Sequence, residues 1–270
     1  MQPITVRAAA ANLARAAYEP LAPFYDSFTA ESKYEPVLDA IETWARAQGL
    51  RGKRLLDVAC GTGKSFEPLL ARGYEVTACD LSPAMVAEAR RNWAGVADIA
   101  VADMRSLPWE CEFDLITCVD DAINYMLDER DLRAALTSMA RALRPDGIAV
   151  FDANTIRAYR TDWSESFDFT EDGTRFSWRG ECSAEAEPGV IARATVRVEH
   201  AGGSCESRHV ERHWRVEELR AACLAAGFQH VVFRGLAEGP RLVGEPDEER
   251  HLKLVCLAAR PTAPARPPAG

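Results

Sequence analysis

The sequence lacks three features: long apolar runs, paired cysteines and an excess of basic residues. No segment reaches about 18 uninterrupted apolar residues, so we predict no membrane-spanning helix. Arg7 and Arg15 interrupt the alanine-rich start, which therefore does not have the pattern of a secretory signal. None of the eight cysteines forms a CxxC pair, and this pattern predicts free thiols in a reducing cytoplasm.

The charge balance bears on possible partners. The 32 lysines and arginines are outnumbered by 41 aspartates and glutamates, which gives a formal net charge of −9. Because phosphate backbones attract clustered basic residues, this balance argues against a nucleic-acid partner. The 47% of apolar and 27% of charged residues are typical of a soluble globular protein, here expected as a monomer or homodimer. A length of 270 residues suits one large domain, or one domain with an insert.

Short apolar runs alternate with amphipathic stretches along much of the chain. The amphipathic stretches have three-to-four spacing, most clearly over residues 35–48, 132–143 and 216–226, and Ser82 followed by Pro83 is typical of a helix start. Alternating strands and helices predict an α/β protein with a doubly wound sheet. The expected sheet has seven strands, at residues 54–60, 74–79, 99–101, 113–119, 148–151, 228–234 and 251–258.

The apolar pattern changes to period two in the second half of the chain. Residues 190, 192, 194, 196 and 198 are all valine or alanine, and they alternate with a mostly polar set. This alternation is typical of antiparallel strands, so we expect an inserted β subdomain over residues 164–214. The segments 51–163 and 215–260 then form one core, and the proline-rich tail 261–270 is expected to be disordered.

A glycine-rich turn follows the first expected strand. Such a turn offers free backbone N–H groups and allows a ligand to come close to the backbone. A P-loop requires glycine at position 58, which is Val58. The dinucleotide fingerprint requires glycine at position 66, which is Phe66, and NAD is therefore disfavoured. S-adenosylmethionine, whose sulfonium side chain needs no phosphate-binding loop, is the remaining interpretation.

Carboxylates follow the first three strands or lie within them. Asp80 ends the second strand, where a carboxylate can bind ribose hydroxyls, and Asp103 follows the third strand, where it can accept a bond from an adenine amino group. Asp57 lies within an apolar strand, where an unpaired charge is costly. We expect it to accept bonds from the turn, and its contact with the ammonium of the cofactor is left open.

Five motifs in order resemble those of class I S-adenosylmethionine-dependent methyltransferases. They are LDVACGTG from Leu56, CDLS from Cys79, ADM from Ala102, FDLITCVD from Phe113 and LRPDG from Leu143, and they cover residues 50–155 approximately. One departure is Ala59, where many members carry glycine. The resemblance implies a Rossmann-like fold, S-adenosylmethionine as cofactor, and cofactor contacts from Asp57, Ala59, Gly61, Gly63, Asp80, Leu81, Asp103, Met104, Val119 and Asp120.

Three further segments are similar to a bacterial branch of small-molecule methyltransferases, among them sugar N,N-dimethyltransferases and glycine-type N-methyltransferases. They are APFYDSF at 22–28, DAINYM at 121–126 and VFDANT at 150–155. The similarity implies a helical N-terminal cap over residues 1–50, with Tyr25 near the amino-acid end of the cofactor and near catalysis. It also places Asn124, Tyr125 and Asn154 toward the methyl acceptor. The alternative is that Tyr25 and Tyr34 are only helix-packing aromatics.

The expected strand 205–214 carries His209, Glu211 and His213 on one face. This face could supply a metal ligand or a base, or it could be a solvated strand face, the interpretation favoured for His209. His213, at the end of the strand, is the first candidate for a catalytic base. Trp178 and His209 are candidates for the acceptor site, with core packing as an equal alternative for the tryptophan.

The remaining expectations concern metal and reaction type. Asp120, Asp152 and Asn154 are placed like the Mg²⁺ ligands of catechol-type O-methyltransferases, but in the branch matched above this pattern implies no metal, and none is expected. The expected reaction is methyl transfer to N or O of a small molecule, with nitrogen favoured by the acidic site. A quinone-type C- or O-methyltransferase and a non-catalytic S-adenosylmethionine-binding protein remain the alternatives.

Overall fold

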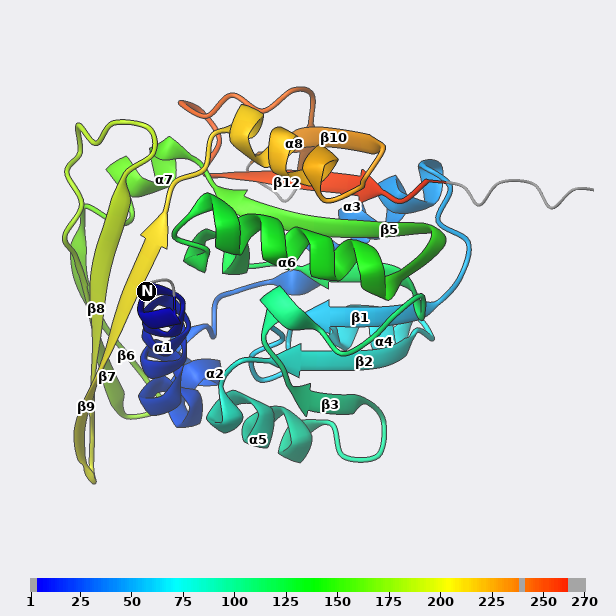
Figure 1. The fold of residues 1–270 in the computed structure, drawn as a ribbon. Helices are drawn as coiled ribbons and strands as arrows, with labels where there is room; N and C mark the ends of the chain where they lie inside the picture. The colour runs from blue at the N-terminus through cyan, green and yellow to red at the C-terminus, as the bar shows by residue number, and fades with distance from the viewer. Residues whose placement is uncertain (1–3, 238–240, 262–270) are drawn as a thin grey trace, which may run out of the picture.

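The computed structural model describes residues 4–237 and 241–261; the expected disordered tail falls, apart from residue 261, outside this part of the chain. Two sheets make up the architecture (Figure 1). The large sheet has eight strands in the order β11-β10-β12-β5-β4-β1-β2-β3. Its strands are β1 (Arg54–Val58), β2 (Glu75–Asp80), β3 (Asp98–Val101), β4 (Phe113–Cys118), β5 (Leu143–Asn154), β10 (His230–Ala237), β11 (Arg241–Val243) and β12 (Lys253–Ala259).

The expected α/β fold is confirmed, with one correction to the sheet. Strands β1 to β5 pair in parallel, whereas β12 is antiparallel to both β5 and β10. The sheet has eight strands rather than seven because β11 adds an edge strand beside β10. At three residues, β11 is too short to show any periodicity in the sequence.

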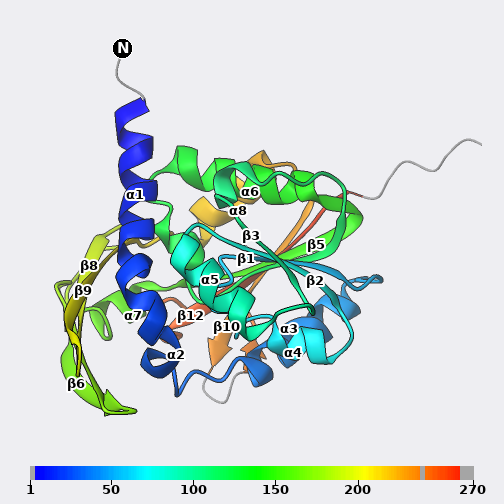
Figure 2. The same ribbon diagram turned by 90° about the horizontal axis from the view of Figure 1, so that it is seen from below.

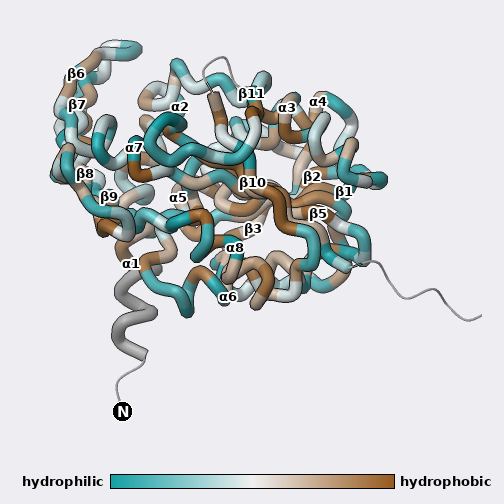
Figure 3. The backbone as a smooth tube through the Cα atoms, turned by 90° about the horizontal axis from the view of Figure 1, so that it is seen from above, coloured by the Kyte–Doolittle hydropathy of each residue, from teal (hydrophilic) through white to brown (hydrophobic). Residues whose placement is uncertain are grey.

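Helices cover both faces of the large sheet. One core cluster joins the sheet to α6 (Glu129–Ala142) and α8 (Val216–Ala225), and the other joins its opposite face to α3 (Tyr34–Ala47), α4 (Glu67–Ala71) and α5 (Pro83–Asn92). Figure 3 shows the hydrophobic colouring concentrated on the central strands. The Ser82 side chain accepts from the Met85 N–H at the start of α5, as expected for a helix cap. No helix in the described residues is long and apolar enough to cross a membrane.

The second sheet is small and antiparallel, with the order β6-β7-β8-β9. Its strands are β6 (Ser166–Glu171), β7 (Thr174–Gly180), β8 (Ile191–His200) and β9 (Gly203–Arg212). The expected alternation is present, because Ala192, Ala194, Val196 and Val198 are buried whereas Ile191 is exposed. The short helix α7 (Ile156–Arg160) connects β5 to this sheet.

The N-terminal helices lie against the inner face of the small sheet. Figures 1 and 2 show α1 (Ile4–Leu21) running between the small sheet and the large one. Leu21 packs with Phe176, Val196 and Val198, so the small sheet has a core of its own with α1. The chain continues from α1 through the 3₁₀ helix η1 (Ala22–Phe24) into α2 (Tyr25–Phe28). Two further 3₁₀ helices, η2 (Met104–Ser106) and η3 (Ala122–Tyr125), lie later in the chain. Because α3 packs on the large sheet, only α1 to α2 of the expected cap lie at the small sheet.

Gly63 ends the glycine-rich turn at φ +95°, and a Cβ there would lie 2.2 Å from the Trp93 Nε1. We predict that Gly63→Val lowers the free energy of unfolding by about 2–4 kcal/mol, which combines left-handed strain with overpacking. Gly95, at φ +75° with nothing near its Cβ position, is the matched control, and Gly95→Val should cost only the strain. Urea denaturation measures both, and equal losses would contradict the packing contribution of Trp93.

Candidate active site

A cavity opens at the carboxyl ends of β1, β2, β3 and β4, where the fold brings the glycine-rich turn next to α1 and α2. Parallel strands present ligand sites at this edge. Of the eleven residues expected at the cofactor, nine line this cavity: Tyr25, Ala59, Gly61, Asp80, Leu81, Asp103, Met104, Val119 and Asp120. Asp57 and Gly63 lie outside the lining.

The turn after β1 is built from left-handed residues and held by Asp80. Ala59 and Gly61 have φ values of +59° and +53°. The Asp80 carboxylate accepts from the Gly61 N–H at 3.0 Å and from the Ser82 N–H at 2.8 Å. Burial raises the pKa of Asp80, and the backbone N–H groups oppose this shift. Its carboxylate oxygens face the cavity with lone pairs left over, as a ribose-binding group requires.

Asp57 has a different role from the one that the motif suggested. Its two oxygens accept from Ser65 Oγ and Thr117 Oγ1, both at 2.5 Å, and its side chain is buried. Burial raises the pKa of Asp57 to about 6, against the effect of these two hydroxyls. Asp57 therefore ties the turn to β4, and the structure does not bring it to the cavity where the ammonium of a cofactor would lie.

Asp103 lies at the opposite end of the cavity from Asp120. Its carboxylate accepts from the Arg105 guanidinium at 2.6 Å, and Arg105 also bonds the buried Asp131 at 2.5 Å. The side-chain hydrogen bonds of Asp103 come first among the causes that raise the pKa of Arg105. This arrangement fixes the Asp103 carboxylate beside Met104, at the expected adenine end.

At the other end, tyrosines surround the Asp120 carboxylate. The Tyr34 hydroxyl donates to Asp120 Oδ2 at 3.0 Å, and Tyr25 lies between this pair and the glycine turn, since a Cβ on Gly61 would lie 3.5 Å from its ring. Burial raises the pKa of Tyr25 well above its usual value, followed by the charge of Asp120. Tyr25 is therefore a neutral phenol at the cavity wall, and Tyr34 shares that wall.

Lys253 at the start of β12 neutralises the carboxylates at this end. Its ammonium lies 3.0 Å from Asp120, 2.7 Å from Asp121 and 3.4 Å from Asp152. Burial acts to lower the pKa of Lys253, but the three carboxylates outweigh it and hold the pKa well above its usual value. The Lys253 ammonium thus lies between Asp120 and Asp152, the two carboxylates whose placement in the sequence is like that of magnesium ligands.

Two asparagines expected at the acceptor instead connect the two sheets. Asn124 donates to the Arg212 carbonyl at 2.9 Å and accepts from the Asn154 N–H at 3.0 Å. The Asn154 amide donates to Asp121 at 2.9 Å and to Glu211 at 3.1 Å. Both asparagines are buried and neither lines the cavity. Of the residues expected at the acceptor, Tyr125 alone is in the lining.

The face of β9 expected to be solvated is buried. His209, Glu211 and His213 have exposed fractions of 5%, 1% and 0%. The expectation of a solvated face is therefore wrong, because α1 and η3 pack against this strand. Burial raises the pKa of Glu211 well above its usual value, and the nearby charge of Asp121 acts in the same direction. Trp178, whose indole N–H donates to the Asp162 carbonyl at 2.9 Å, also lies outside the cavity lining.

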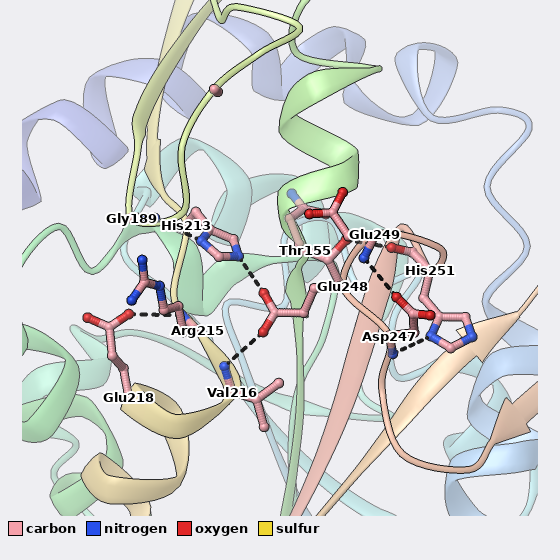
Figure 4. A network of polar contacts seen from close by, with 12 residues as sticks. Thr155, Gly189, His213, Arg215, Val216, Glu218, Asp247, Glu248, Glu249 and His251 are labelled. Carbon is pink, nitrogen blue, oxygen red and sulfur yellow. Dashed lines mark hydrogen bonds and ion pairs between the residues drawn. The ribbon is translucent and has the colours of Figure 1, made fainter.

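His213, the first candidate for a base, has both ring nitrogens in use (Figure 4). Nδ1 accepts from the Gly189 N–H at 3.0 Å, which places the ring proton on Nε2. Nε2 then donates to the Glu248 carboxylate at 2.8 Å. His213 does not line the cavity. Its hydrogen bond to Glu248 instead joins the end of the small sheet to the loop before β12.

Two residues at the Asp120 end of the cavity were not singled out from the sequence. Tyr18 on α1 lines the cavity. Lys253, far from Tyr18 in the sequence, contacts the carboxylates of Asp120, Asp121 and Asp152. Tyr18 lies in an alanine-rich helix that has no motif, and Lys253 begins a strand that was expected only as part of the core. Neither position has a local signal, because both depend on contacts across the fold.

Known proteins resemble this chain in sequence and in fold. The model of a methyltransferase domain matches residues 55–147. A Geobacillus sp. (strain WCH70) protein named as a methyltransferase is 29% identical over 222 residues, which are 78% of this chain and 88% of the other. A dTDP-3-amino-3,6-dideoxy-alpha-D-glucopyranose N,N-dimethyltransferase of Streptomyces fradiae is 29% identical over 179 residues, 63% of this chain and 60% of the relative.

Among solved structures, an S-adenosylmethionine-dependent methyltransferase from Clostridium acetobutylicum has the same fold, with a TM-score of 0.74 at 22% identity. It covers 90% of this chain and 99% of its own. The fold, the methyltransferase domain at residues 55–147 and the carboxylates at the strand ends together support a class I S-adenosylmethionine-dependent methyltransferase. It is an enzyme whose cofactor is S-adenosylmethionine.

We predict that Asp80→Ala weakens binding of S-adenosylhomocysteine by about 1.5–3 kcal/mol, the usual size of hydrogen bonds to a charged group. The carboxylate lines the cavity where ribose hydroxyls are expected. Titration calorimetry measures the affinity, and Asp98→Ala, at an exposed position on β3, is the control. Unchanged affinity in the Asp80 variant would remove the ribose assignment.

For His213→Ala we predict a loss of about 1.5–3 kcal/mol in the free energy of unfolding, because the contacts of this buried ring with Glu248 and Gly189 both disappear. Affinity for S-adenosylhomocysteine should stay within about a factor of three. Glu248→Gln, which can still accept from Nε2–H, should lose less stability. A large drop in turnover at unchanged stability would instead make His213 the base.

Proposed function

We propose that the enzyme transfers a methyl group to the nitrogen of a small-molecule amine. One observation carries this proposal: the ionised Asp120 carboxylate lies in the wall of the cavity, between Tyr34 and Lys253. Burial alone would raise the pKa of Asp120, but the Lys253 ammonium and the hydrogen bonds around it hold the pKa below its usual range. A negative charge at this place favours an amine, which becomes an ammonium on methylation.

The residues of the chain bind and orient the reactants. Asp80 is assigned to the ribose, Asp103 and Met104 to the adenine, and Gly61 with Tyr25 to the amino-acid end of the cofactor. When bound, S-adenosylmethionine supplies a methyl group that is already activated by its sulfonium. The protein then needs to align an acceptor lone pair and exclude water, so that proximity provides most of the rate enhancement.

We assign the small sheet and α1 to the acceptor side. Helix α1 lines the tyrosine-rich end of the cavity, and the small sheet packs on the other side of α1 (Figure 1). Asn124 ties the small sheet to the core through the Arg212 carbonyl. The sugar-directed N,N-dimethyltransferase relative is the comparison that supports an amine-bearing acceptor. On this assignment, β6 to β9 act as a lid over the acceptor.

Release of S-adenosylhomocysteine from a panel of acceptors tests the proposal. The panel contains dTDP-linked amino sugars, glycine, a phenol and a dicarboxylic acid. We expect turnover with amines. Turnover restricted to the phenol or the dicarboxylic acid would overturn nitrogen as the acceptor atom, and tight cofactor binding without turnover on any metabolite extract would favour a non-catalytic binding protein.

Asp120→Asn tests the role of the charge, and we predict a decrease of at least about tenfold in kcat/KM for the amine. Asparagine tolerates the left-handed backbone at this position, where φ is +63°. Asp146→Asn is a matched control, because Asp146 is also left-handed, at φ +64°, but exposed and far along the chain from the cavity residues. Steady-state kinetics compares the two, and equal effects would contradict the assignment.

A further inference from the structure

A chain of four hydrogen bonds runs from the cavity wall into the small sheet. It begins at Tyr18 Oη on α1, which lies 3.0 Å from Tyr125 Oη on η3. Tyr125 Oη lies 2.7 Å from His209 Nδ1, and His209 Nε2 lies 2.8 Å from Ser207 Oγ. Ser207 Oγ then donates to the Ala17 carbonyl at 2.5 Å. The chain thus starts and ends on α1.

Each donor in this chain is determined from the Ser207 end. Ser207 has one hydroxyl proton, and the Ala17 carbonyl can only accept it. Ser207 Oγ must therefore accept from His209, so that the imidazole carries its proton on Nε2. Burial lowers the pKa of His209 to about 4, so the ring is neutral and has one N–H near pH 7. Nδ1 is then an acceptor.

The same counting continues outward to the cavity. Because Nδ1 accepts, Tyr125 donates its only proton to His209, and its oxygen must accept from Tyr18. Tyr18 thereby uses its own proton inside the chain. Tyr18 and Tyr125 both line the cavity, and the Tyr18 oxygen is the outer end of the hydrogen-bond chain. It can offer only lone pairs to a ligand.

We propose that Tyr18 binds the methyl acceptor, and that the chain through Tyr125, His209 and Ser207 holds the Tyr18 oxygen as a hydrogen-bond acceptor. Tyr18 is thus a substrate-binding residue, and His209 and Ser207 are positioning residues. This inference rests on the proposed amine methylation and gives it a specificity: the acceptor atom must carry a hydrogen. A carboxylate would place oxygen lone pairs against those of Tyr18.

The consequence for the reaction concerns how many methyl groups are added. A neutral primary or secondary amine donates an N–H to Tyr18 and points its lone pair elsewhere. After it gains a methyl group, the ammonium keeps an N–H on Tyr18, and water takes the extra proton after release. A neutral tertiary amine has no N–H to donate. We therefore expect methylation to stop at the tertiary amine.

The first experiment compares amines in three states of methylation. Its probes are a dTDP-linked 3-amino sugar with no, one or two N-methyl groups, and glycine with the same series. The kcat/KM of the tertiary member should be at least about 100-fold below that of the secondary one, as expected for a site whose polar group is left unpaired. Efficient turnover of the tertiary amine would overturn the inference while leaving amine methylation intact.

Variants at the two ends of the hydrogen-bond chain should change different quantities, the kcat/KM for the secondary amine and the discrimination against the tertiary amine. Tyr18→Phe should lower kcat/KM for the secondary amine by about tenfold, mainly through KM, and should leave the affinity for S-adenosylhomocysteine unchanged. Tyr74→Phe, at a buried tyrosine bonded to Glu42, is the control for loss of a buried hydroxyl. Ser207→Ala removes the fixed acceptor of the His209 proton, and should reduce the discrimination against the tertiary amine.

The last experiment needs no acceptor. Nitrogen NMR of protein labelled in histidine, with S-adenosylhomocysteine bound, reports which ring nitrogen of His209 carries the proton, and His209→Gln assigns the signals. We expect a neutral ring with the proton on Nε2 down to about pH 5, and a shift of the proton toward Nδ1 in Ser207→Ala. A proton on Nδ1 in the unaltered protein overturns the inference. If no amine in the panel reacts, this measurement still tests the inferred direction of the hydrogen-bond chain, independently of the proposed function.

Discussion

The arrangement of the site depends on placing three aspartates around the ammonium of Lys253, with the carboxyl group of Glu211 beside Asp121. Asp120 and Asp121 follow β4, Asp152 lies near the end of β5, and Glu211 comes from the small sheet. Ionised side by side, they would repel one another at a cost that burial increases. Two features oppose this repulsion: Lys253 contacts three of them, and burial raises the pKa of Glu211. Strand β12, the small sheet and the Asp120 end of the cavity are therefore joined by one electrostatic balance.

Much of the large sheet could be predicted from the sequence, because its strands and helices follow local apolar patterns. The residues at its strand ends could be predicted for the same reason, and Asp80 and Asp103 line the cavity as expected. Asp57 shows the limit of a motif. It has the same chemistry as Asp80, but it is directed toward Ser65 and Thr117, and only the three-dimensional packing distinguishes the two roles.

What could not be predicted is the interior of the contact between α1, the small sheet and η3. The alternation in β9 correctly placed His209 and Glu211 on one face, but alternation does not tell which face is covered. The segment that covers this face is distant in the sequence, since Ser207 and its partner Ala17 are 190 residues apart. Tyr18 went unrecognised for the same reason, since its importance comes from Tyr125 and not from its neighbours in α1.

The bond from Ser207 to α1 ends on a main-chain carbonyl, that of Ala17. Every amino acid supplies such a carbonyl, so this contact does not constrain the side chain at position 17 except in size. The sequence of α1 can then drift over evolution while the helix stays docked on β9, provided that residue 17 stays small enough for its buried place. Homologues with dissimilar N-terminal sequences can accordingly keep the same enclosure, and their acceptor preferences can diverge without loss of the fold.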